Sequence, residues 1–186
     1  MGGTLERTLA SLPAPEPAAL EASERLTELI RQEMAAAGGT IAFRRFMELA
    51  LYTPGLGYYS GGSHKFGPGG DFITAPELSP LFARCLARQV DQVLERLGAG
   101  EVLELGAGSG VMAAELLAEL ERLESLPQRY SILELSGELR QRQHRTLADR
   151  VPHLLERVRW LDCLPEAGFR GVMVGNEVVD ALAVER

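Results

Sequence analysis

The sequence lacks most features that would indicate a membrane, disulfide-rich or nucleic-acid-binding protein. No apolar run approaches the ~20 residues of a membrane-spanning helix. Cys85 and Cys163 give neither a disulfide framework nor a metal-ligand spacing. Lys65 is the only lysine, the arginines form no basic patch, and the net charge is -7. We therefore expect a cytoplasmic protein with no metal, no membrane association and no nucleic-acid partner.

The 186 residues are typical of a globular enzyme, being 46% hydrophobic and 24% charged. We predict a flexible lead-in at 1–19, because this segment is rich in proline and alanine. Helices and a glycine-rich loop are expected over 20–100, and the first part of an α/β domain over 101–186. Alternating strands and helices in that last segment are typical of a parallel sheet. The expected strands are 101–105, 130–135, 158–161 and 171–174.

The most specific local motif is a glycine turn that follows the first expected strand. Residues 102–110 read VLELGAGSG, which places the turn at Gly106, Ala107, Gly108 and Gly110. A dinucleotide turn of the form G-x-G-x-x-G would need a glycine at 111, where the chain has Val111. The G-x-G-x-G spacing instead predicts S-adenosylmethionine (SAM) as the cofactor.

Two acids lie at strand ends near this turn. Glu104 could organise the methionine ammonium group of SAM, directly or through water, or it could be a strand-end carboxylate bonded to nearby backbone amides. Glu134 follows the second strand, 24 residues after Gly110. An acid at that offset can accept hydrogen bonds from both ribose hydroxyls, although an isolated strand-end acid is usually only solvated.

The segments after the third and fourth strands carry weaker signals. Leu161 and Asp162 would border the adenine ring, or they could belong to a plain surface loop. Asn176, Glu177 and Asp180 could orient a cationic methyl acceptor and take its proton. If a helix begins at Glu177, these residues could equally be capping groups in its first turn.

Four segments together resemble a known family. They are FMELALYTPGLGYY at 46–59, FGPGGDFITAPE at 66–77, ELGAGSG at 104–110 and NEVVDA at 176–181. This pattern closely resembles the MidA-like class I methyltransferases, which include the mitochondrial protein arginine methyltransferase needed for respiratory complex I assembly. The resemblance covers about residues 26–186. It departs from the family at Ala183, where the family usually has proline.

The resemblance implies a Rossmann-like class I SAM-dependent methyltransferase fold with an N-terminal helical region. It implies methyl transfer to a protein arginine, and a loop that folds over the cofactor through Gly70, Asp71, Thr74 and Pro76. A small-molecule methyltransferase, or a non-catalytic assembly factor using the fold for binding, remains open because fold does not fix substrate.

The predicted sheet has only four strands, whereas the resemblance implies seven. We therefore expect either the front part of a longer protein or a homodimer formed through the edge of the fourth strand, since an open strand edge invites pairing.

Overall fold

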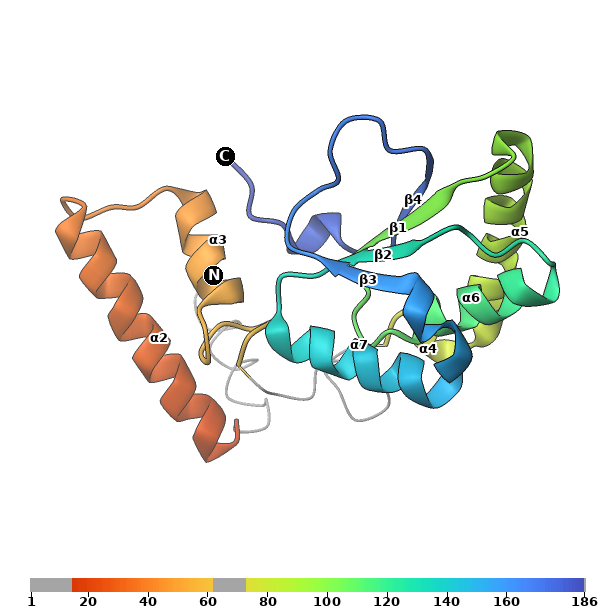
Figure 1. Ribbon diagram of the computed structural model, residues 1–186. Coiled ribbons are helices and arrows are strands. Elements are labelled where there is room, and N and C mark those ends of the chain that lie inside the picture. Colours follow the sequence, from red (N-terminus) through yellow and green to blue (C-terminus); the bar gives the residue numbers. More distant parts are fainter. Residues whose placement is uncertain (1–14, 62–72, 186) are drawn as a thin grey trace, which may run out of the picture. The chain divides into compact units, whose positions relative to one another are not determined.

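The computed structural model describes residues 15–61 and 73–185, which fall into two compact units. The helical unit comprises the described residues up to Gly61 together with 183–185. The α/β unit comprises the described residues from Ile73 to Leu182. The chain thus leaves the helical unit once and returns to it after the sheet (Figure 1).

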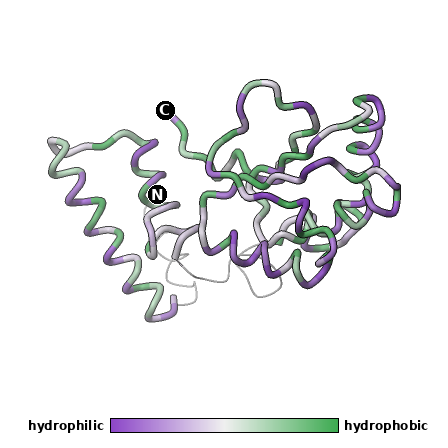
Figure 2. The backbone as a smooth tube through the Cα atoms, in the orientation of Figure 1, coloured by the Kyte–Doolittle hydropathy of each residue, from purple (hydrophilic) through white to green (hydrophobic). Residues whose placement is uncertain are grey.

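The helical unit contains α2 (Pro17–Ala36) and α3 (Phe43–Tyr52). α2 begins at Pro17, three residues before the predicted start, because proline is favoured in the first turn of a helix. Hydrophobic and hydrophilic residues alternate along α2 (Figure 2), and none of its residues is buried. The helix therefore keeps an amphipathic pattern without entering a core.

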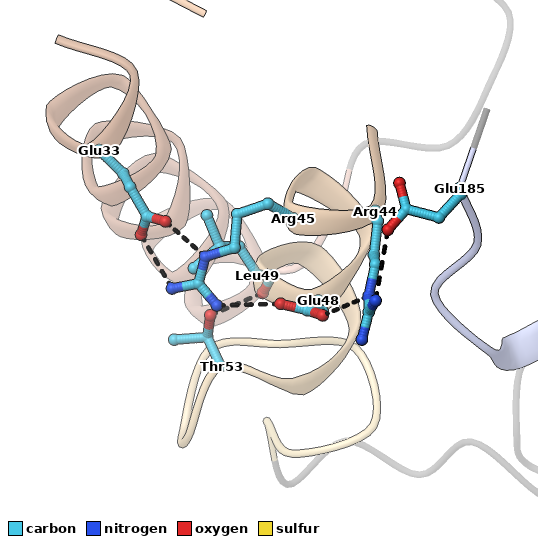
Figure 3. Close-up of polar contacts among 7 residues, drawn as sticks. All are labelled: Glu33, Arg44, Arg45, Glu48, Leu49, Thr53 and Glu185. Atoms are coloured by element: carbon cyan, nitrogen blue, oxygen red, sulfur yellow. Dashed lines mark hydrogen bonds and ion pairs between the residues drawn. The ribbon is translucent and has the colours of Figure 1, made fainter. Parts of the chain in front are cut away.

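Charged side chains join the parts of the helical unit (Figure 3). The Arg45 guanidinium donates to Glu33 on α2 and, at 3.1 Å, to Glu48 on its own helix. Arg44 donates to Glu48 at 3.1 Å and to Glu185 at 3.3 Å. These side chains are all substantially exposed to solvent.

The α/β unit is built on a four-stranded parallel sheet with the strand order β3-β2-β1-β4. The strands are β1 (Glu101–Leu105), β2 (Tyr130–Leu133), β3 (Val158–Leu161) and β4 (Gly171–Gly175). This arrangement confirms the predicted parallel α/β fold. Because all strands are parallel, the segments that follow them emerge at one edge of the sheet.

Helices α4 (Ala75–Leu78), α5 (Pro80–Leu97), α6 (Val111–Arg122) and α7 (Gly137–Arg150) belong to the same unit, with short 3₁₀ segments η1 (Pro152–Arg157) and η2 (Val179–Ala181). Ser79 caps α5 by accepting the Leu81 N–H at 3.2 Å. Val102 and Ile132 point from the sheet into a core shared with α5, α6 and α7. α6 and α7 run beneath the strands in Figure 1.

The structure groups the chain differently from the predicted segment 20–100. α5 packs on α6 and on β4, so it belongs with the sheet and not with α2 and α3. The predicted lead-in at 1–19 lies outside the described residues, apart from its last five. Within the described ranges, no helix is both long and apolar enough to cross a membrane.

Candidate cofactor site

The predicted glycine turn joins β1 to α6 with three left-handed residues. Gly106, Gly108 and Gly110 have φ values of 60°, 53° and 83°. A Cβ on Gly110 would lie 2.9 Å from the Cα of Gln143, so backbone conformation and space both require glycine there. Ala107 is buried, and its carbonyl accepts the Gly110 N–H at 2.8 Å.

The segment after β4 packs against the same turn. A Cβ on Gly106 would lie 3.1 Å from a methyl group of Val178. The two segments that leave β1 and β4 are therefore in contact, as expected for neighbouring parallel strands.

Glu104 is fully buried, and its predicted role towards the methionine ammonium group stays a prediction. Its carboxylate accepts a hydrogen bond from the Tyr130 hydroxyl at 2.6 Å, not from backbone amides. Burial raises the pKa of Glu104 to about 7, and the nearby charge of Glu134 adds to the rise while the Tyr130 hydrogen bond opposes it. This places a carboxyl group that titrates near neutrality directly before the glycine turn.

Glu134 is also buried, at the end of β2. Its carboxylate accepts the Ser136 N–H at 3.0 Å and the Gln143 side-chain amide at 3.0 Å. Burial raises the pKa of Glu134, while these two hydrogen bonds, the Leu135 N–H and the Arg140 charge act to lower it. The side chain is thus held in one orientation at the sheet edge where a ribose is expected.

Arg140 connects the ends of β2 and β3. Its guanidinium donates to the Glu134 carbonyl at 2.7 Å, to the Leu161 carbonyl at 2.6 Å and to the Asp162 carboxylate at 2.8 Å. Leu161 is half-buried, whereas the Asp162 side chain is 90% exposed. Asp162 therefore lies in an exposed loop but is anchored by an arginine.

The segment before α5 also contacts the glycine turn. Ser109 donates to the Glu77 carboxylate and accepts the Val111 N–H at 3.3 Å. Thr74 precedes α4, and Pro76 is buried within it. Gly70 and Asp71, the other predicted residues of this loop, lie outside the described residues.

The segment after β4 does not form the helix that was expected to begin at Glu177. No α-helix begins at Glu177: this exposed residue has a left-handed backbone (φ 53°), and only the short η2 follows. Because a left-handed residue cannot start a right-handed helix, Glu177 and Asp180 do not share an α-helix face and Asn176 does not cap one. The proton-accepting role of these residues stays a prediction.

Sequence reasoning missed Arg140, Gln143, Glu77 and Tyr130. A signal for Gln143 was present, because Leu139, Gln143 and Leu147 recur at four-residue steps and are the buried residues of α7. A glutamine within an apolar stripe indicates a buried amide that needs partners.

The described residues contain no cluster of three or more side chains able to hold a metal ion.

Several known proteins are similar to this chain. The family model described as "Putative S-adenosyl-L-methionine-dependent methyltransferase" matches residues 85–186. A crystal structure of a COG1565 superfamily member from Burkholderia thailandensis, bound to S-adenosyl-homocysteine, is 56% identical with a TM-score of 0.86. The match covers 93% of this chain and 46% of that chain. A second COG1565 structure from the same organism is 54% identical, with a TM-score of 0.82, over 94% of this chain and 44% of that one.

A more distant relative is the mouse protein named "Protein arginine methyltransferase NDUFAF7, mitochondrial". It is 34% identical over 142 residues, which cover 70% of this chain and 32% of the relative. The chain therefore spans less than half the length of the two solved structures and about a third of the mouse protein. Since the family model matches more than half of the chain, from residue 85 to 186, the chain belongs to the S-adenosyl-L-methionine-dependent methyltransferase family that its MidA-like motifs predicted.

Proposed function

We propose that this chain binds SAM at the carboxyl edge of its sheet and forms the cofactor-binding part of a protein arginine methyltransferase. The observation that carries the proposal is the convergence of the glycine turn with buried, oriented Glu134 at one edge of a parallel sheet. The solved relative that binds S-adenosyl-homocysteine supports it at 56% identity.

Each part of the site has a role in holding the cofactor. Gly106 and Gly108 leave room for the methionine part to approach the backbone. The Glu134 carboxylate accepts hydrogen bonds from the two ribose hydroxyls. Leu161, which precedes Asp162, covers the adenine ring. Glu104 cannot reach solvent, so it acts on the methionine end without direct contact, through the charge that it carries above its pKa of about 7.

Bound SAM supplies a methyl group that its sulfonium has already activated. The protein then has to position the acceptor and remove its proton. We assign those tasks to Asn176, Glu177 and Asp180, which offer one amide and two carboxylates. A guanidinium is the cation that such carboxylates orient best, because it forms paired hydrogen bonds with them. The name of the mouse relative supports arginine as the acceptor.

Calorimetric titration of the 186-residue chain with SAM and with S-adenosylhomocysteine (SAH) tests the cofactor part. We expect saturable binding of both, weakened at least about tenfold in Glu134→Ala, because the ribose loses a charged acceptor. Glu138→Ala, an exposed acid on α7, is the matched control and should bind normally. Absence of binding by wild-type chain with a folded circular dichroism spectrum would contradict the proposal.

The acceptor is tested with methyl-labelled SAM in cell extract from a strain lacking the gene, supplemented with the full-length protein. Label should enter protein and be recovered as methylarginine after hydrolysis. Glu177→Gln should reduce the label while leaving SAH affinity unchanged, because this side chain handles the acceptor only. Label confined to small solutes would overturn the arginine assignment.

A further inference from the structure

Gln143 links three segments of the candidate cofactor site. It lies on α7 and is fully buried. Its side-chain nitrogen donates to the Gly108 carbonyl at 3.1 Å and to the Glu134 carboxylate at 3.0 Å. Its side-chain oxygen accepts the indole N–H of Trp160 at 2.9 Å. One amide therefore contacts the glycine turn after β1, the acid after β2 and a side chain of β3.

The orientation of this amide is determined by its partners. An indole N–H can only donate, so the amide oxygen must face Trp160. Both N–H groups then face acceptors, namely the Gly108 carbonyl and the Glu134 carboxylate. Because the group is buried and no hydrogen remains unused, an apolar side chain at 143 would remove one hydrogen bond from each of the three partners.

We propose that Gln143 is a positioning residue that holds Glu134 for the cofactor ribose and transmits cofactor binding to Trp160. The inference rests on the proposed function, since it concerns how the same site is organised. Gln143 does not itself touch the cofactor: it acts through the Glu134 carboxylate and the Gly108 carbonyl, which it orients.

Several charged groups near Glu134 also act on its carboxylate, and they would remain if Gln143 were replaced. Arg140 lies on α7, as Gln143 does, and donates to the Glu134 carbonyl. Glu104 on β1 repels the Glu134 carboxylate when both are charged. Asp162, beyond β3, is paired with Arg140. Among the described side chains, only Gln143 donates a hydrogen bond to the carboxylate, since its other donors are backbone N–H groups.

Trp160 provides an optical readout, because it is the only tryptophan in the chain. Its ring is half-buried and lies 5.5 Å from the His144 ring. When ribose hydroxyls donate to Glu134, the hydrogen bond that the Gln143 amide donates to this carboxylate weakens. The hydrogen bond that the Trp160 indole N–H donates to the amide oxygen then changes with it. Addition of SAH should therefore shift Trp160 fluorescence along the same saturation curve as calorimetry.

The test compares Gln143→Met with Gln141→Met, an identical substitution at an exposed position of α7. SAH affinity is measured by calorimetry from pH 5 to 8 and by Trp160 fluorescence. We expect Gln143→Met to bind about tenfold more weakly at neutral pH. The pKa of Glu134 should rise without the amide, so affinity should fall at a higher pH on acidification than in wild type. Gln141→Met should match wild type in both respects.

A double-mutant cycle separates positioning from general destabilisation. If Gln143 acts through Glu134, Gln143→Met should cost little further affinity in a Glu134→Gln background, whereas independent effects would add. The inference is overturned if Gln143→Met is folded and keeps the wild-type affinity and pH profile, or if the two substitutions are additive. If wild-type chain binds no SAH, the proposed function fails first and the inference with it.

Discussion

The two units of the chain use polar side chains in opposite ways. In the helical unit, Glu33, Arg45 and Glu48 form a network that is open to water (Figure 3). In the α/β unit, Glu134 and Gln143 are buried and fully hydrogen-bonded. Exposed ion pairs are screened and contribute little, whereas buried polar groups are costly unless every partner is present.

This difference indicates where function lies. A protein gains little stability from burying a carboxylate and an amide instead of apolar side chains, so such groups are typical of ligand sites. The helical network can tolerate substitution, but the buried network cannot. Two comparisons between matched positions in the two units test this difference, and the pH dependence of the buried Glu104 adds a third test within the α/β unit.

The largest expected effect comes from two glycines with nearly the same backbone. Gly110 has φ 83° beside Gln143, whereas Gly38 has φ 84° and open space where a Cβ would be added. Gly38→Ala should lower the free energy of unfolding by about 1 kcal/mol, because it adds only the strain of a left-handed alanine. Gly110→Ala adds a steric overlap between the new Cβ and Gln143, so it should lower the free energy of unfolding by about 4 kcal/mol. Urea denaturation followed by circular dichroism measures both, and equal losses would contradict the geometry.

A smaller effect is expected from the pH dependence that Glu104 introduces. Its pKa is about 7 in the folded state against 4.5 without burial, so the folded state binds the proton more tightly. Stability should therefore fall as pH rises from 4.5 to 7, by about 3 kcal/mol. Glu104→Gln should remove most of this decrease in urea midpoints measured between pH 4.5 and 8.

Tyr130→Phe gives a second test of the pH dependence that Glu104 introduces. It removes the hydrogen bond that lowers the pKa of Glu104, so the decrease in stability should continue to higher pH than in wild type. An unchanged pH profile in both variants would show that Glu104 does not titrate in this range.

The smallest effect is expected in the helical unit, where Arg45 can be compared with Arg140 of the α/β unit. Arg140→Met removes hydrogen bonds to the Glu134 and Leu161 carbonyls and should cost about 2 kcal/mol. Arg45→Met removes only exposed pairs, so it should lower the melting temperature slightly, and the difference should vanish in 1 M salt. A salt-independent loss at Arg45 as large as at Arg140 would contradict the comparison.

The sheet could be predicted from sequence because its strands are short apolar runs with glycine or polar boundaries. β1 and β3 have their predicted bounds, and the glycine turn follows β1 as expected. α4 was not predicted, because four residues within a glycine-rich segment give no periodic signal. Glu177 could not be predicted as left-handed, since a glutamate rarely adopts that conformation.

From motif spacing alone, the candidate site was predicted at the ends of strands. Glu104, within β1, and Glu134, directly after β2, were found in this way, but their partners were not. Arg140 and Gln143 lie on α7, whose sequence is mainly polar and suggests a solvated helix. The hydrogen bonds that hold the strand ends depend on how this helix packs, which only the three-dimensional structure shows.

The path of the chain between the units has a consequence for the order of folding. The α/β unit is continuous in sequence, whereas the helical unit is assembled from two segments whose contacting residues, Arg44 and Glu185, are 141 positions apart. Contacts between distant residues form late because the intervening chain must first be ordered. During synthesis, the sheet and its glycine turn can therefore be complete before the helical unit receives its final segment.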